Sequence, residues 1–167
     1  MFGFGDGAPV VAKASIVIDR PADDVFQFIG HNFFVNYPRW SSEVKELKQI
    51  SPGEVKLGTR ARQVRVDQGH RSESIFGVTI FAPGQRICFE GISNPYRCDY
   101  ELKSGEEEQA TRVTFTFELP KLEMYMRPFE KLIRVVIQDG AERTVRNLKR
   151  LIEAETTVYA DRCETDR

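Results

Sequence analysis

The chain has 167 residues, with 24 Lys and Arg side chains against 25 Asp and Glu, so it suits a single domain with a net charge of −1. Apolar residues make up 41% of the sequence and charged residues 29%, which is typical of a globular protein and too apolar for a disordered one. A nearly neutral chain has no general attraction for nucleic acid or anionic lipid, and no run approaches the ~20 apolar residues of a membrane span.

The cysteines and the first residues of the chain indicate the cellular compartment of the protein. Cys88, Cys98 and Cys163 are odd in number and lack C-x-x-C spacing, which favours a reducing compartment. The first residues have no basic segment, and glycine and aspartate interrupt their apolar residues, so they do not resemble a signal peptide. We therefore expect a cytoplasmic protein with a flexible N-terminus (1–10), a single domain (11–158) and a flexible tail (159–167).

The first elements are predicted to be a strand and two short helices. Residues 11–18 alternate between apolar and polar side chains, as a half-buried strand does. Pro21 suits the first position of a helix, and the acidic residues after it favour the first turn. We expect Gly30 to end this helix, and a second helix over residues 31–37 to stop before Pro38, because the residue before proline avoids the helical region.

The next eighty residues are predicted to be entirely β. Strands are expected over residues 43–51, 58–67, 70–81, 85–93, 95–103 and 109–119. The connections between them are short and rich in glycine and proline. Because such short links join only antiparallel neighbours, the strands form a meander.

This sheet is expected to have one apolar face covered by a long helix. Phe115 and Phe117 share one face of the last strand, and Tyr100 lies on the corresponding face of the strand before it. In the strand over residues 70–81, Phe76, Val78 and Ile80 alternate with other residues and are therefore expected on one face of the sheet. A helix from residue 127 to about 157 carries an apolar stripe that would cover the sheet: Phe129, Leu132, Ile133, Val136, Gly140, Val145, Leu148, Leu151 and Ile152.

The order of these elements, together with local sequences, resembles a known superfamily. The segments IVIDRPADDVFQFI, YPRW, LGTRARQVRV, GVTIFAPGQRICFEG and ATRVTFTFEL resemble the START-like or SRPBCC superfamily, especially its polyketide cyclase/dehydrase and lipid-transport branch. The resemblance implies an α+β helix-grip fold, in which a curved seven-stranded antiparallel sheet wraps around a long C-terminal helix and two short helices separate strands 1 and 2. It also implies a cavity between sheet and helix for a lipid, polyketide, quinone or similar molecule.

The resemblance suggests which residues line this cavity, although a residue of this kind taken alone more often belongs to an ordinary core, so the set is better evidence than its members. The candidates are Phe33, Tyr37, Trp40, Phe76, Val78, Phe89, Tyr100, Phe115, Phe117, Met126, Phe129, Ile133 and Val136. A dry void of ~300 Å³ would cost about 7 kcal/mol, comparable with the net stability of a whole domain. We therefore expect the cavity either to hold an apolar ligand or to be partly collapsed on its own side chains.

No motif commits the chain to a reaction, a metal or a cofactor. The glycine-rich residues 3–7 lack the strand, helix and lysine of a phosphate loop, and His31 and His70 have no partner at metal-ligand spacing. Polar residues that share the parity of inward positions are Gln63, Arg65, Ser72, Ser74 and Tyr100. Of these, Arg65, Tyr100 and Ser74 are the catalytic candidates for a cyclase. The sequence does not decide which face of the strand over residues 58–67 points into the cavity, because Val64 and Val66 are apolar and have the opposite parity to Gln63 and Arg65.

Three classes of function follow. A carrier or binding protein for a hydrophobic small molecule is favoured, because the expected interior is rich in rings and poor in titratable groups. A polyketide cyclase or aromatase acting in the same cavity is the alternative. A protein-interaction module or chaperone cofactor, binding through an exposed apolar cavity mouth, is the third. The sequence leaves monomer and dimer open.

Overall fold

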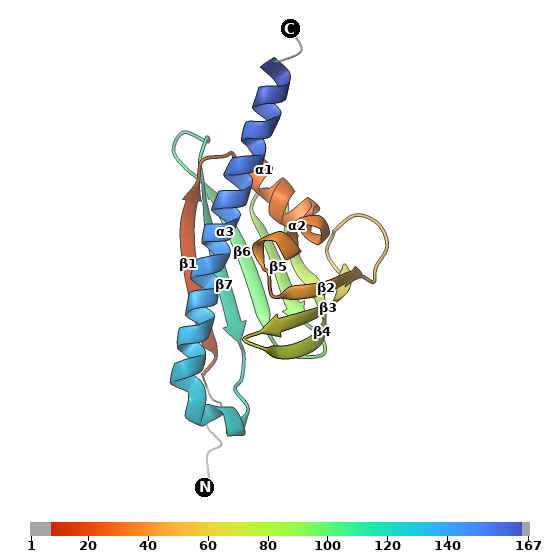
Figure 1. Ribbon diagram of the computed structural model, residues 1–167, viewed down its shortest axis with the longest axis vertical. Coiled ribbons are helices and arrows are strands. Elements are labelled where there is room, and N and C mark those ends of the chain that lie inside the picture. Colours follow the sequence, from red (N-terminus) through yellow and green to blue (C-terminus); the bar gives the residue numbers. More distant parts are fainter. Residues whose placement is uncertain (1–7, 165–167) are drawn as a thin grey trace.

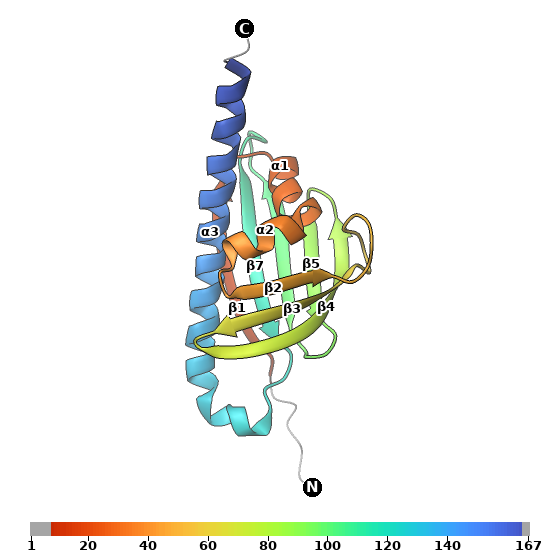
Figure 2. The same cartoon turned by 45° about the vertical axis from the view of Figure 1, so that its right-hand side comes forward.

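A single seven-stranded antiparallel sheet forms the framework of the protein, with the strand order β1-β7-β6-β5-β4-β3-β2. The computed structural model describes residues 8–164, with side chains described as far as residue 155. The sheet is strongly curved, and a long C-terminal helix lies along β1 (Figures 1 and 2). Two short helices separate β1 from β2, so the predicted helix-grip arrangement is confirmed.

All seven strands were predictable from alternation, and each boundary lies within two residues of its expected position. Their bounds are β1 Val10–Ile18, β2 Val44–Gln49, β3 Arg60–Asp67, β4 His70–Ala82, β5 Arg86–Gly91, β6 Arg97–Ser104 and β7 Thr111–Leu119. Every neighbouring pair is antiparallel, including β1 with β7, which closes the meander onto the first strand.

The prediction for β4 is wrong at one position, because the strand carries a bulge. The register of β4 with β5 shifts between Val78 and Ile80, and a shift of one residue exchanges the two faces of a strand. Phe81 rather than Ile80 therefore packs against the core, where its ring meets the edge of the Phe26 ring at 5.4 Å between centroids.

The early helical region differs from its prediction at both ends. Helix α1 (Ala22–Phe26) continues through a π-helical turn, η1 (Gln27–His31), so Gly30 does not end a helix. A side chain there would lie 2.7 Å from the Phe26 ring, so glycine is required by packing. Helix α2 (Phe33–Trp40) contains Pro38, which was expected to lie beyond it. Proline removes one backbone donor near the end of the helix, and the burial of the rings on either side outweighs that loss.

The long helix begins later than predicted. A 3₁₀ segment, η2 (Met124–Phe129), contains Pro128, and α3 follows it from Glu130–Glu164. The second half of the stripe is buried as expected, at Val145, Leu148 and Ile152. The first half is not: Phe129 is 59% exposed and Leu132 62% exposed. No element of the described chain covers them, because the sheet ends where Val10 pairs with Leu119.

Side chains of α3 cover the free edge of β1. The Gln138 amide donates to the Lys13 carbonyl oxygen at 2.9 Å and accepts from the Lys13 backbone N–H at 3.3 Å. Lys149 Nζ donates to the Val17 carbonyl oxygen at 2.7 Å. An unprotected edge strand can pair with other chains, so these contacts both attach α3 and block the edge.

Candidate functional site

The concave face of the sheet is filled by stacked aromatic rings that α2 positions. Phe33, Tyr37 and Trp40 follow one another at helical spacing, so they lie on the side of α2 that faces the sheet. The Phe33 ring stacks on Phe89 of β5 at 4.2 Å between centroids and on Tyr37 at 4.7 Å. Phe76 of β4 meets the edge of Phe33 at 6.1 Å. These contacts make one buried cluster between α2 and the sheet.

A void of about 20 Å³ remains within this cluster. Its walls combine rings with a few polar groups: Phe33, Tyr37, Gln63, Phe76, Phe89, Tyr96, Cys98 and Tyr100. A space of this size holds about one water molecule. Of the two expected forms of the cavity, this corresponds to the one that is collapsed on its own side chains.

A continuous chain of side-chain hydrogen bonds runs along one wall of the void. Arg65 Nη1 donates to the Tyr37 hydroxyl at 2.7 Å, and that hydroxyl lies 3.1 Å from Gln63 Oε1, to which it donates. Gln63 Nε2 donates to the Tyr96 hydroxyl at 2.9 Å and to Ser74 Oγ at 3.3 Å. Gln63 is therefore the hub that links two tyrosines and a serine from different elements.

The inward face of β3 is now defined. Ala61 and Gln63 are buried on the concave side, and Arg65 reaches Tyr37 from the same side. Val64 is also buried, although it has the opposite parity. Because both faces of β3 hold a buried residue, alternation alone could not decide between them.

The site carries no unbalanced charge. Asp67 accepts from Arg65 Nε at 3.1 Å and from Arg65 Nη2 at 2.9 Å, and Ser41 Oγ accepts from Nη1 at 3.2 Å. Burial raises the pKa of Tyr37 to about 12, although Arg65 acts in the opposite direction. Burial likewise raises the pKa of the Cys98 thiol to about 12. Arg65 is therefore neutralised by Asp67, while the phenol and the thiol stay protonated near neutral pH.

The structure brings together only part of the predicted site. Among the expected ligand-binding residues, those that line the void are Phe33, Tyr37, Phe76, Phe89 and Tyr100. Trp40, Val78 and Phe115 belong to the surrounding core, and Phe117 is partly buried. Met126, Ile133 and Val136 are half-buried, whereas Phe129 is exposed. The expected ligand-binding set is therefore divided between two regions: α2 with the sheet, and η2 with the first half of α3.

Among the expected catalytic residues, Arg65 and Ser74 join the hydrogen-bonded chain through Tyr37 and Gln63. Tyr100 lines the void beside them. Tyr96 and Cys98 also line the void, although neither is among the expected site residues. Their shared parity with Tyr100 was the available signal, since alternate residues of a strand face the same side.

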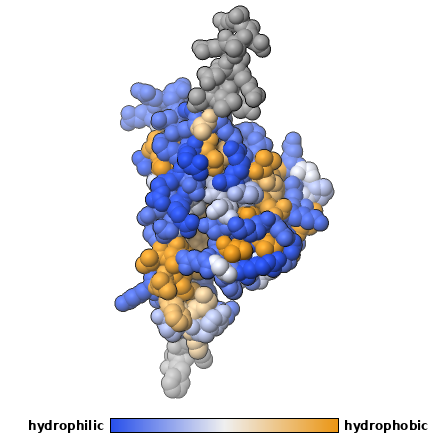
Figure 3. Space-filling view, in the orientation of Figure 1, coloured by the Kyte–Doolittle hydropathy of each residue, from blue (hydrophilic) through white to orange (hydrophobic). Residues whose placement is uncertain are grey.

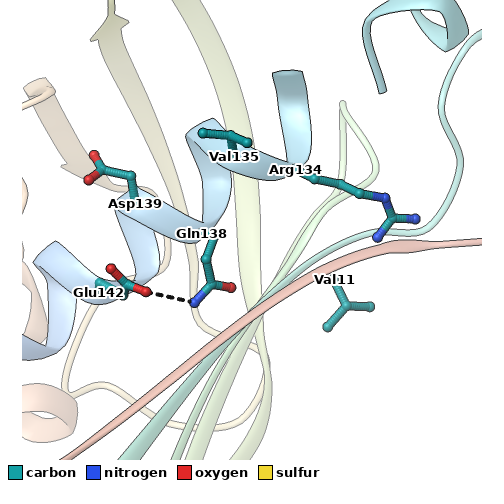
Figure 4. A pocket seen from close by; sticks show the side chains of 6 residues that line it. All are labelled: Val11, Arg134, Val135, Gln138, Asp139 and Glu142. Carbon is teal, nitrogen blue, oxygen red and sulfur yellow. Dashed lines mark hydrogen bonds between the residues drawn. The ribbon is translucent and has the colours of Figure 1, made fainter. Parts of the chain in front are cut away.

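A larger hollow lies elsewhere, between α3 and the edge strand. This groove of about 510 Å³ is lined by Val11 of β1 and by Arg134, Val135, Gln138, Asp139 and Glu142 of α3 (Figure 4). Gln138 donates to Glu142 there at 3.2 Å. Half of the lining side chains are charged, and Val11 and Val135 are exposed, so the groove is a surface feature outside the ring-lined face.

Two further properties concern the described residues alone. No helix within residues 8–164 is both long enough and apolar enough to cross a bilayer. The described His, Cys, Asp and Glu side chains do not form any group of three or more that could hold a metal ion.

A curved antiparallel sheet that holds a C-terminal helix over a ring-lined concave face defines the helix-grip class of proteins. Within that class, the family of polyketide cyclase/dehydrase and lipid transport proteins matches residues 9–153 of this chain. The chain belongs to this family. No curated protein matches the sequence.

Solved structures share the fold at low sequence identity. The protein TTHA0849 from Thermus thermophilus is 17% identical, with a TM-score of 0.72, over 87% of this chain and 98% of that one. A START superfamily protein from Mycobacterium smegmatis is 13% identical, with a TM-score of 0.68, over 86% of this chain and 97% of the other. The di-domain ARO/CYC StfQ from the steffimycin biosynthetic pathway is 12% identical, with a TM-score of 0.72, over 90% of this chain and 52% of StfQ.

The protonated phenol of Tyr37 predicts a loss of stability in alkali. The unfolded chain releases this proton at a pKa of 10.0 and the folded protein at about 12, so the unfolded state binds fewer protons between these values. The free energy of unfolding should therefore fall as pH rises from 10 to 12, by about 2–3 kcal/mol from this group. Urea unfolding at several pH values measures the fall.

The Tyr37→Phe variant should show a shallower decline over that range. Tyr125→Phe, which changes an exposed tyrosine of η2, serves as the matched control. Identical slopes for Tyr37→Phe and the wild type would contradict the buried-phenol explanation.

Proposed function

We propose that this protein binds an uncharged small molecule that carries aromatic or other flat rings and a carbonyl or hydroxyl group. The observation that carries the proposal is the hydrogen-bonded chain from Arg65 through Tyr37 and Gln63 to Tyr96, set in a wall of rings. Sites for small molecules combine an apolar lining with a few fixed polar groups in this way. The family match supports a ligand of the hydrophobic class.

The charge balance of the wall favours an uncharged ligand. Arg65 is engaged by Asp67, Tyr37 and Ser41, which leaves no free cation for a carboxylate or phosphate. Gln63 and Tyr96 line the void, and their amide and hydroxyl groups, which hydrogen-bond to each other, can instead donate to or accept from a ligand. An anionic ligand would lose its hydration without gaining a counter-ion, which is costly in a buried site.

Binding requires the rings or α3 to move, because a void of about 20 Å³ admits no more than a water molecule. The residues that line the void come from α2 and the sheet region and not from α3, and in the first half of α3 the apolar side chains Ile133, Val136 and Ile137 are only half-buried. We infer that a ligand enters beside this half of the helix and displaces rings of the cluster. The surface there is hollowed between α3 and strands β2 and β3 (Figure 3).

Catalysis as a cyclase or aromatase is a second proposal, favoured by the 2.7 Å contact of Arg65 with the Tyr37 hydroxyl. A phenol polarised by a guanidinium is a hydrogen-bond donor suited to an enolate or a ketone oxygen. In this reading a poly-β-ketone substrate cyclises by attack of an enolate carbon on a ketone of the same chain, with loss of water. Conversion of a tetraketide thioester to a cyclic product, lost in Arg65→Met, would favour this function over carriage.

The binding test compares two probes with the same rings and different charge. We expect isothermal titration to detect 2-acetylnaphthalene and to show at least about tenfold weaker binding of 2-naphthoate, because the anion has no counter-ion in the wall. Gln63→Leu should weaken binding of 2-acetylnaphthalene by about tenfold. The exposed substitution Gln85→Leu should leave it unchanged. Tighter binding of the carboxylate, or equal affinities in Gln63→Leu and the wild type, would overturn the proposal.

A further inference from the structure

One end of the molecule carries a concentration of exposed apolar side chains. The η2–α3 patch consists of Met124, Tyr125, Phe129, Leu132 and Val135, whose side chains are 59–73% exposed. These are five of the twelve large hydrophobic residues exposed on the described part of the chain, and they fall within twelve consecutive residues. Contiguous apolar surface of this kind marks an interaction site more often than scattered exposure does.

The patch occupies an extremity of the protein, and of its five residues only Val135 also lines the groove between α3 and β1. The segment η2 and the start of α3 form the lower end of the long axis in Figure 1, and the hydrophobic colouring gathers there in Figure 3. Phe129 and Leu132 are three residues apart, so they lie on neighbouring positions of one side of the helix. A protruding end of this shape can touch a flat surface without obstruction from the sheet.

Charge around the patch differs in sign from that of the rest of the chain. Residues 121–135 contain Lys121, Arg127, Lys131 and Arg134 against two glutamates, a net charge of +2, whereas the whole chain carries −1 and the remainder therefore −3. All four basic side chains are exposed. Of the four, Arg134 alone forms an ion pair among the described residues, with Glu130 at 3.2 Å. The overall charge, which argued against attraction to anionic lipid, conceals this separation.

We propose that the η2–α3 patch docks the protein reversibly on an anionic membrane surface. Exposed aromatic and aliphatic side chains enter the interfacial region of a bilayer, and flanking lysines and arginines are attracted to acidic headgroups. A second copy of the chain is a poorer partner, because a symmetric dimer would bring two surfaces of charge +2 together. The proposal does not rest on the identity of the ligand in the concave face.

Co-sedimentation with lipid vesicles tests the docking. Wild-type protein should bind vesicles of phosphatidylcholine and phosphatidylserine at 7:3. It should bind vesicles of pure phosphatidylcholine at least about tenfold more weakly, and it should dissociate from the acidic vesicles as the salt concentration rises. Arg127→Glu with Lys131→Glu should reduce binding to the acidic vesicles by about tenfold or more. Lys56→Glu with Lys103→Glu, an equal charge change at exposed sites elsewhere, should retain more of the binding.

A second pair of variants tests the apolar part. Leu132→Ser should weaken vesicle binding severalfold, whereas Leu57→Ser should not, although the two leucines are 62% and 64% exposed. Equal binding by Leu132→Ser and the wild type would overturn the proposal. So would equal binding to acidic and neutral vesicles. A stable dimer that Leu132→Ser dissociates would assign the patch to self-association, and binding lost only on deletion of residues 1–7 would assign the contact to that segment.

Discussion

Replacement of Phe33 by alanine is expected to lower the free energy of unfolding by about 3–5 kcal/mol. Phe33 is 2% exposed and is stacked between Tyr37 and Phe89, with the edges of Trp40 and Phe76 against it. Removing the ring abolishes these contacts and adds a cavity beside a void that already exists. Urea unfolding followed by the fluorescence of Trp40 measures the loss.

The adjacent residue provides the control for this substitution. Phe34 is on the same helix and is only partly buried, so Phe34→Ala should cost less than half as much. The enlarged void of Phe33→Ala should also admit 2-acetylnaphthalene with less displacement of the surrounding rings, so this compound should raise its melting temperature more than that of the wild type. A cost below about 1.5 kcal/mol for Phe33→Ala would mean that the rings are loosely packed, contrary to the distances between them.

Most of the fold could be predicted because its signals are local. Most strands alternate with a period of two residues, and the turns between them contain glycine or proline, so the meander follows from the sequence alone. The exceptions arise where packing between distant segments decides. The bulge after Val78 and the π-helical turn at Gly30 depend on how Phe81 and Phe26 pack together.

The first half of α3 shows a different limit of sequence reasoning. Its apolar stripe continues without a break from Phe129 to Ile152, and periodicity therefore predicts that the whole stripe is buried. Burial also needs a partner surface, and the sheet is shorter than the helix. What a stripe packs against is a property of the assembled fold, so exposure of Phe129 and Leu132 could not be predicted.

The site was predicted by residue type more than by arrangement. Rings from α2 and from the inward faces of β4, β5 and β6 were expected, since parity places them on one side. The hydrogen-bonded chain was not, because it joins Tyr37 to Gln63 and Arg65 across 26 and 28 residues. The partners on α2 explain why Gln63 rather than Val64 faces the cavity, and no pattern within β3 contains that information.

Gln63→Leu is expected to destabilise the protein by about 2–4 kcal/mol, although leucine is similar in size. Gln63 is 3% exposed, and its amide accepts from Tyr37 and donates to Tyr96 and Ser74. The substitution removes all three hydrogen bonds at once and leaves the hydroxyl groups of Tyr37, Tyr96 and Ser74 without this partner. Each buried polar group left unsatisfied costs about 1–3 kcal/mol. Gln85→Leu, at an exposed turn, should change the free energy of unfolding by no more than about 0.5 kcal/mol.

A double-mutant cycle separates the hydrogen-bonded chain from simple packing. Tyr96→Phe removes the hydroxyl that Gln63 Nε2 reaches at 2.9 Å, so its cost should be smaller in the Gln63→Leu background than in the wild type. The expected coupling is about 0.5–3 kcal/mol, measured by urea unfolding of the four proteins. If the two costs add to within about 0.3 kcal/mol, Gln63 and Tyr96 do not act as one unit, and the proposed ligand-binding wall loses its hub.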